Sequence, residues 1–176
     1  MLSLAVFCAL LFGWAFGGRL RRFEAAGLRM LLLPVFALLL QRLFYRPWTL
    51  VLSYAIIFVF LFFNRHLKKT VFFFGTGSLC NLLVIAANGW RMPVSVRALE
   101  VLSSTGQADL LAGNIPMYAV ADAGTRLLFL GDIFYWPVPY IGGFASVGDI
   151  LLCVGVFFCL MAAMSPTRLP RRVCSG

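Results

Sequence analysis

Residues 147–164 read VGDILLCVGVFFCLMAAM, an apolar run with a single charged side chain, Asp149, near its start. As a helix this run would rise about 27 Å, which is close to the ~30 Å thickness of a bilayer's hydrocarbon core. Its apolar residues are continuous rather than alternating, which favours a helix over a strand of a membrane barrel. The run therefore predicts a transmembrane helix.

The rest of the chain repeats this pattern. Four further apolar runs of similar length cover residues 2–18, 28–45, 48–63 and 71–87. Only helices and closed barrels satisfy the backbone in lipid. We therefore expect an all-α fold: an integral membrane helical bundle of about five transmembrane helices, forming a single domain over residues 1–176. Residues 88–146 would form an interfacial or re-entrant segment on the outer side.

The composition agrees with a membrane protein. The 176 residues are 62% hydrophobic and 12% charged, whereas soluble domains are about 45–50% apolar and about 25% charged. A soluble chain this short exposes too much surface to hide so many apolar side chains.

The charges predict an orientation. The formal net charge is +9, and the basic residues form short clusters between apolar runs, at 19–22, 65–69 and 168–172. Membrane loops are marked in this way, so we expect a lipid bilayer as the partner and no nucleic acid. With the N-terminus outside, ten basic residues lie on the cytoplasmic side and five on the outer side. The positive-inside rule thus predicts a protein of the cytoplasmic membrane with its C-terminus in the cytoplasm.

The first run carries small residues at every fourth position: Ala5, Ala9, Gly13 and Gly17. Such a face lets another helix approach closely. It has two interpretations, packing inside this chain, or contact with a partner membrane subunit or a second copy in a homodimer.

The outer segment is polar in its middle and apolar near its end. Residues 95–102 predict a short interfacial helix, and residues 106–124 have the composition of loops. The residues expected to face lipid are Val94, just before this helix, and Ala98, Val101 and Leu102 within it. Residues 127–140 are apolar but are interrupted by Asp132 and two prolines, which favours a re-entrant or interfacial segment over a sixth span.

Two aspartates of the outer half invite different explanations. Ser146 and Asp149 have the spacing of a capping box, with Asp in place of Glu, at the start of the last helix. Asp132 lies in an apolar run, where an ionisable group usually has a partner. Its partner is either Arg126 or Arg91, in an ion pair, or a ligand or proton.

A polar stripe follows one face of the fourth helix and includes Asn81 and Asn88. Asn81 either bonds to another helix or lines a cavity that continues to Asn88 and Arg91. Gly89 suits the position after the helix end, and Pro93 prevents continuation. The complete set of candidate ligand-binding residues is Asn81, Asn88, Arg91, Arg126, Asp132 and Asp149.

Three motifs in this half carry a resemblance: Asn88-Gly89 followed by Met92-Pro93-Val94, then Leu130-Gly131-Asp132, then Ser146-Val147-Gly148-Asp149. Together they resemble a bacterial family of small multi-pass membrane proteins, the domain of unknown function family five-three-one-seven. The resemblance implies a bacterial inner-membrane protein and supplies no activity. The aromatic, proline-rich stretch after Asp132 is not expected to be shared by the family.

Familiar enzyme signatures are missing from the sequence. It has no HExxH, GxSxG or Walker motif. Its five cysteines and one histidine have no metal-ligand spacing, so we predict no metal, no cofactor and no catalytic residues. An enzyme that acts on a lipid with the two carboxylates is the least favoured hypothesis.

Two other hypotheses are close. The first is a protein that binds a lipid, a quinone or another small amphiphile in a polar pocket of the outer leaflet. The alternative is a non-catalytic structural or accessory subunit of a larger membrane complex. The spread of polar residues through the outer half favours the first.

Overall fold

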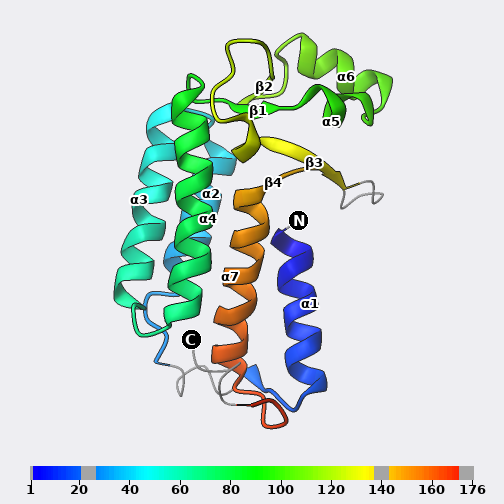
Figure 1. The fold of residues 1–176 in the computed structure, drawn as a ribbon. Coiled ribbons are helices and arrows are strands. Elements are labelled where there is room, and N and C mark those ends of the chain that lie inside the picture. The colour runs from blue at the N-terminus through cyan, green and yellow to red at the C-terminus, as the bar shows by residue number, and fades with distance from the viewer. Residues whose placement is uncertain (1, 21–26, 137–142, 171–176) are drawn as a thin grey trace. The chain divides into compact units, whose positions relative to one another are not determined.

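A computed structural model describes residues 2–20, 27–136 and 143–170 of the chain. It places a helix in each of the five apolar runs (Figure 1). These helices are α1 (Leu2–Ala15), α2 (Leu32–Leu43), α3 (Pro47–Phe63), α4 (Lys68–Ala87) and α7 (Val147–Met164). By length and composition, α4 and α7 can cross a membrane, whereas α1, α2 and α3 are apolar but shorter.

The segment between α4 and α7 is not an irregular loop. Its elements in order are β1 (Met92–Val94), α5 (Val96–Glu100), α6 (Ser104–Leu111), β2 (Tyr118–Val120), the 3-10 helix η2 (Leu128–Leu130), β3 (Asp132–Trp136) and β4 (Gly143–Ser146). The strands form one sheet in the order β2-β1-β3-β4. β1 is parallel to both β2 and β3, and β3 is antiparallel to β4.

This sheet corrects the all-α expectation. The fold is mostly helical with a small mixed sheet, and the predicted re-entrant or interfacial segment contains the strand β3 at Asp132–Trp136. The prediction failed because each strand has only a few residues, too few for alternation to show. The proline-rich stretch at 137–142 lies outside the described residues.

The chain divides into two compact units, residues 77–150 and residues 2–76 together with 151–176. The first unit has its own apolar core, which consists of Val94, Ala98, Leu99 and Leu110. Val94 and Ala98 were expected to face lipid, but they are 0% and 2% exposed. The short helix is confirmed as α5, but Ala98 and Leu99 on it pack in the core of this unit, whereas Val101, just after the helix, is 54% exposed.

The second unit holds its helices together by close approaches. Ser53 on α3 donates hydrogen bonds to the carbonyls of Ala37 (3.0 Å) and Thr49 (2.8 Å). On α1, Ala9 is buried in a cluster with Met161 and Met164 of α7. The small-residue face of α1 is therefore occupied, at this position, by the chain's own last helix.

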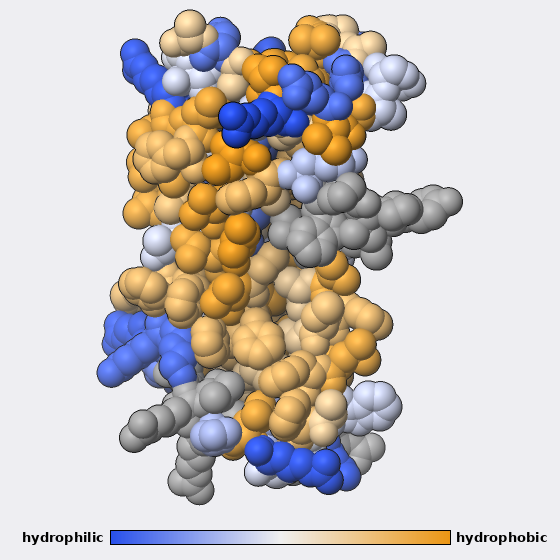
Figure 2. All heavy atoms as spheres, turned by 45° about the vertical axis from the view of Figure 1, so that its right-hand side comes forward, coloured by the Kyte–Doolittle hydropathy of each residue, from blue (hydrophilic) through white to orange (hydrophobic). Residues whose placement is uncertain are grey.

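Several polar side chains of this chain are buried, and many large apolar side chains on its helices are exposed. Buried polar side chains include Ser53, Asn64, Thr70 and Ser78, each 0% exposed. Large apolar side chains are exposed instead, among them Leu32 at 80%, Trp14 at 72% and Leu43 at 70%. Hydrophobic residues cover most of the face seen in Figure 2.

Candidate functional site

The start of α7 is fixed by a reciprocal capping box. The Asp149 backbone N–H donates to Ser146 Oγ (3.0 Å), and the Ser146 backbone N–H donates to Asp149 Oδ2 (3.0 Å). Both donors belong to the helix terminus, where N–H groups lack intrahelical partners and a negative charge is stabilised. The capping prediction is thereby confirmed.

Asn81 on α4 ties this cap to a second helix. Its Nδ2 donates to Asp149 Oδ1 (2.9 Å), and its Oδ1 accepts from Ser146 Oγ (2.9 Å). Asn81 therefore bonds to another helix, which is the first of its two predicted roles. Because both partners lie in the capping box, this one asparagine of α4 holds the start of α7 in place.

Gly148 makes this close approach possible. A Cβ placed on Gly148 would fall on Asn81 Oδ1 and would lie 2.9 Å from the carbonyl oxygen of Gly77. Only a residue without a side chain leaves room there, which explains the glycine between Ser146 and Asp149.

Asp132 is brought to the same place by the sheet. It begins β3, where it pairs in register with Ser146 of β4 and Val94 of β1. Its carbonyl oxygen accepts from the Ser95 N–H (3.0 Å). The preceding residue packs tightly as well, since a Cβ on Gly131 would lie 2.7 Å from the Pro93 carbonyl oxygen. The residues of the three motifs thus lie against one another within one unit.

The carboxyl group of Asp132 is the least satisfied group of this region. The residue is 2% exposed, and Asp132 Oδ1 has no hydrogen-bond partner among the described residues. Burial first, and then the negative charge of Asp149, raise the pKa of Asp132 from 3.8 to about 8. Asp132 therefore keeps its proton at neutral pH. We call Asn81, Asp132, Ser146 and Asp149 the Asp132–Asp149 cluster.

Two hydroxyls share this lack of partners, Thr70 Oγ1 and Ser78 Oγ. A hydroxyl can rotate its hydrogen to suit its surroundings, and it carries no charge. A buried carboxyl group costs far more when it ionises without a partner. Of these three buried groups, Asp132 is thus the one for which the missing partner is most costly.

The remaining candidate residues lie elsewhere. Asn88 bonds to the backbone of Arg126, donating to its carbonyl (2.8 Å) and accepting from its N–H (2.9 Å). The side chains of Arg91 and Arg126 belong to exposed residues, and neither contributes to the pKa shift of Asp132. Of the six predicted residues, the cluster therefore contains three, Asn81, Asp132 and Asp149. Asn88 and Arg126 form a separate contact, and Arg91 belongs to neither group. Among the described residues, no arginine acts as a counter-ion of Asp132.

Sequence reasoning assigned Ser146 to a helix cap and missed its second bond, to Asn81. It also missed the contact between Gly131 and Pro93. The glycines inside two of the motifs are the signal for both, because a glycine beside polar residues often marks a close backbone approach.

Within the described ranges, no three His, Cys, Asp or Glu side chains gather where they could hold a metal ion. The cluster offers instead one capped carboxylate, one buried carboxyl group, one amide and one hydroxyl. This arrangement can hold or release a proton and can form hydrogen bonds with a bound group.

Fold and site together define a mostly helical chain with two helices apolar enough to span a membrane and a small mixed sheet that carries one buried carboxyl group, Asp132. The chain belongs to a family of unknown function, DUF5317, whose sequence profile matches residues 26–161. The family resemblance inferred from the three motifs is confirmed. No curated protein and no solved structure matches the chain.

Proposed function

We propose that this chain is a multi-pass membrane protein that binds a small amphiphile, such as a lipid or a quinone, at the Asp132–Asp149 cluster. One observation carries the proposal: Asp132 is buried, and its Oδ1 has no partner among the described residues. Buried polar groups are almost always hydrogen-bonded, and the exceptions often mark functional sites. A bound polar head would supply the missing partner.

The surface of the helices supports the membrane part of the proposal. With 14 and 12 residues, α1 and α2 are too short by themselves for a hydrocarbon core of about 30 Å, and α3, with 17, is at the lower end of the spanning range. Their exposed side chains are nevertheless apolar, as Phe7, Phe36 and Phe62 illustrate at 57%, 55% and 62% exposure. We therefore include these three helices among five spans, with flanking residues and local thinning of the bilayer making up the length.

Charge supports an orientation. The basic clusters at 65–69 and 168–172 would be cytoplasmic, and residues 88–146 would lie at the outer leaflet of the cytoplasmic membrane. The amphiphile would then reach Asp132 from the outer leaflet.

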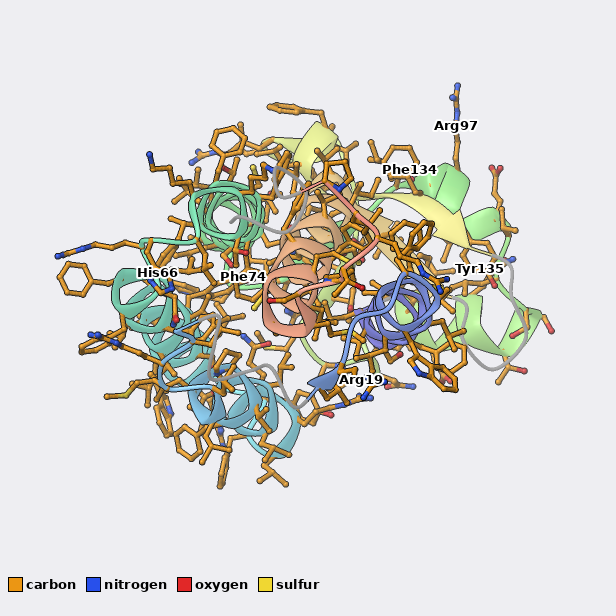
Figure 3. The ribbon with its side chains drawn as sticks, turned by 90° about the horizontal axis from the view of Figure 1, so that it is seen from below. Arg19, His66, Phe74, Arg97, Phe134 and Tyr135 are labelled. Atoms are coloured by element: carbon orange, nitrogen blue, oxygen red, sulfur yellow. The ribbon has the colours of Figure 1, made fainter. Side chains whose placement is uncertain are left out.

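The test is chemical analysis of what the protein carries. The full chain would be purified in mild detergent, and its organic extract would be quantified by mass spectrometry. We expect one amphiphile near a 1:1 ratio in the wild type. Asp132→Leu should lose it while the protein stays monodisperse, because Leu has a similar size and removes an unsatisfied buried group. Arg97→Gln is the matched control, since Arg97 is exposed on α5 and extends outward (Figure 3).

Identical extracts from the wild type and Asp132→Leu would contradict the proposal. A stoichiometric protein partner without any specific amphiphile would favour the alternative, an accessory subunit of a larger complex. The small-residue face of α1 is a poor site for such a partner at Ala9, which packs against Met161 and Met164.

A further inference from the structure

Asp149 is the hydrogen-bonded carboxyl group of the cluster. Its two oxygens accept hydrogen bonds from Asn81 Nδ2 and from the Ser146 backbone N–H. It also lies in the first turn of α7, where the helix dipole favours negative charge. Each of its two carboxyl oxygens therefore already has one hydrogen-bond donor within the cluster.

Among the described residues, no positive charge lies close enough to Asp132 to contribute to its pKa shift. The elements that pair or pack with β3 are β1, β4, η2 and α5. β1, β4 and η2 contain no ionisable side chain, and α5 contains only Arg97 and Glu100, both exposed. On β3 itself the other titratable group is Tyr135, which packs against Phe144 in the apolar core. The charge that acts on Asp132 is that of Asp149.

Two ionised carboxylates without a counter-ion are unfavourable in such surroundings. Asp132 is therefore a neutral carboxylic acid at neutral pH, with one O–H donor and one carbonyl acceptor. A neutral acid of this kind matches a carbonyl or a hydroxyl group, because such a group needs one hydrogen bond and no compensating charge.

Charged head groups fit the cluster less well. A phosphate would lie beside the negative charge of Asp149, and the cluster contains no Arg or Lys to neutralise it. An ammonium group would have to lose its hydration to pair with Asp149 or with an ionised Asp132, which is costly in these surroundings. Resting on the proposed function, we infer that the amphiphile's polar end is a neutral carbonyl or hydroxyl group, as in a quinone or a long-chain alcohol, bound by Asp132.

The inference can be tested with four probes that share a ten-carbon chain and differ only in the head group: decyl-benzoquinone, decanol, decylamine and decyl phosphate. Calorimetric titrations would use the full chain in phosphatidylcholine nanodiscs, with empty nanodiscs subtracted. At about pH 6.5 we expect the quinone and the alcohol to bind at least about tenfold more tightly than the amine and the phosphate, an effect of the size of one buried hydrogen bond.

Two variants separate a neutral site from a charged one. Asp132→Asn keeps a donor and an acceptor, so it should retain quinone binding within about threefold. Asp132→Leu should reduce the binding to the nanodisc background. Raising the pH to about 9.5 should weaken quinone binding to the wild type, since Asp132 loses its O–H above its pKa of about 8. Asp132→Asn should show no such change.

The outcomes are distinct. Tightest binding of the amine or the phosphate at about pH 6.5 would overturn the inference while supporting the proposed function. An equal pH dependence in Asp132→Asn and the wild type would also overturn it, because the change would then come from another group. No binding of any probe above the nanodisc background would overturn the proposed function together with the inference.

Discussion

Asp132 and Asp149 are the same residue type in different surroundings. Asp149 accepts hydrogen bonds from Asn81 and Ser146 and begins a helix. Asp132 is more deeply buried, and its Oδ1 is without a partner among the described residues. The carboxyl group of Asp149 thus has hydrogen-bond donors, whereas burial without such a donor at Oδ1 raises the pKa of Asp132.

Gly148 offers a prediction about the tightest contact of the cluster. Gly148→Ala would place a methyl group on Asn81 Oδ1, and 2.9 Å from the Gly77 carbonyl oxygen. We expect it to lower the free energy of unfolding by about 1–3 kcal/mol, the usual cost of overpacking. Unfolding monitored by circular dichroism in mixed detergent micelles would measure this change.

Gly143→Ala is the control, because a Cβ at Gly143 meets nothing within 4 Å. It should change the free energy of unfolding by less than about 0.5 kcal/mol. Equal stability of Gly148→Ala and the wild type would show that α4 and the start of α7 are not in the close contact described.

The capping box could be predicted at this scale because it depends on residues three apart. The isolation of Asp132 could not be predicted in the same way. It depends on Val94 and Ser146, which the sheet brings beside Asp132 from distant parts of the sequence. The sequence therefore left an ion pair with Arg91 or Arg126 open, although both arginines are exposed.

At the scale of elements, α7 makes two different contacts along its length, one with α4 and one with α1. A Cβ on Gly155 would lie 2.5 Å from the backbone nitrogen of Phe74 and 2.7 Å from its Cα. A Cβ on Gly13 would instead meet the ends of Met164 and Met161, with Met164 Sδ at 2.5 Å. The backbone of α4 cannot yield, whereas methionine side chains can rearrange.

This contrast predicts that Gly155→Ala is much more damaging than Gly13→Ala. Both substitutions bring the same gain in helix propensity, so the difference between them reports packing alone. We expect Gly155→Ala to lower the free energy of unfolding by about 2 kcal/mol more than Gly13→Ala. Thermal unfolding of the two variants, purified in the same detergent, would measure it; equal losses would contradict the tighter contact of α7 with α4.

The helices could be predicted because each is a long run of one composition. The sheet could not, because its strands contain three to five residues and β1 pairs with β2 across the whole of α5 and α6. The apolar face of α5 was correctly recognised as a helical pattern, but the pattern cannot tell lipid from a protein core. That distinction depends on what covers the face, which is a property of the fold.

At the scale of the molecule, two helices are long and apolar enough to cross a membrane. The next quantities to measure are how many times the chain crosses the bilayer and in which direction. A chain with its native cysteines replaced would carry single cysteines at four exposed positions: Tyr45, Arg65, Ser104 and Thr167. A membrane-impermeant maleimide would then be applied to intact cells and to permeabilised cells.

With five spans and the N-terminus outside, α2 and α4 run outward, and α3 and α7 run inward. Positions 45 and 104 should therefore react in intact cells, and positions 65 and 167 only after permeabilisation. The reverse pattern would contradict the orientation while keeping the number of crossings. Reaction of positions 45 and 65 from the same side would show that α3 does not cross. In the proposed orientation, the basic residues near positions 65 and 167 would hold these ends at the cytoplasmic face. The outer half, with Asp132, would then face the leaflet from which an amphiphile enters.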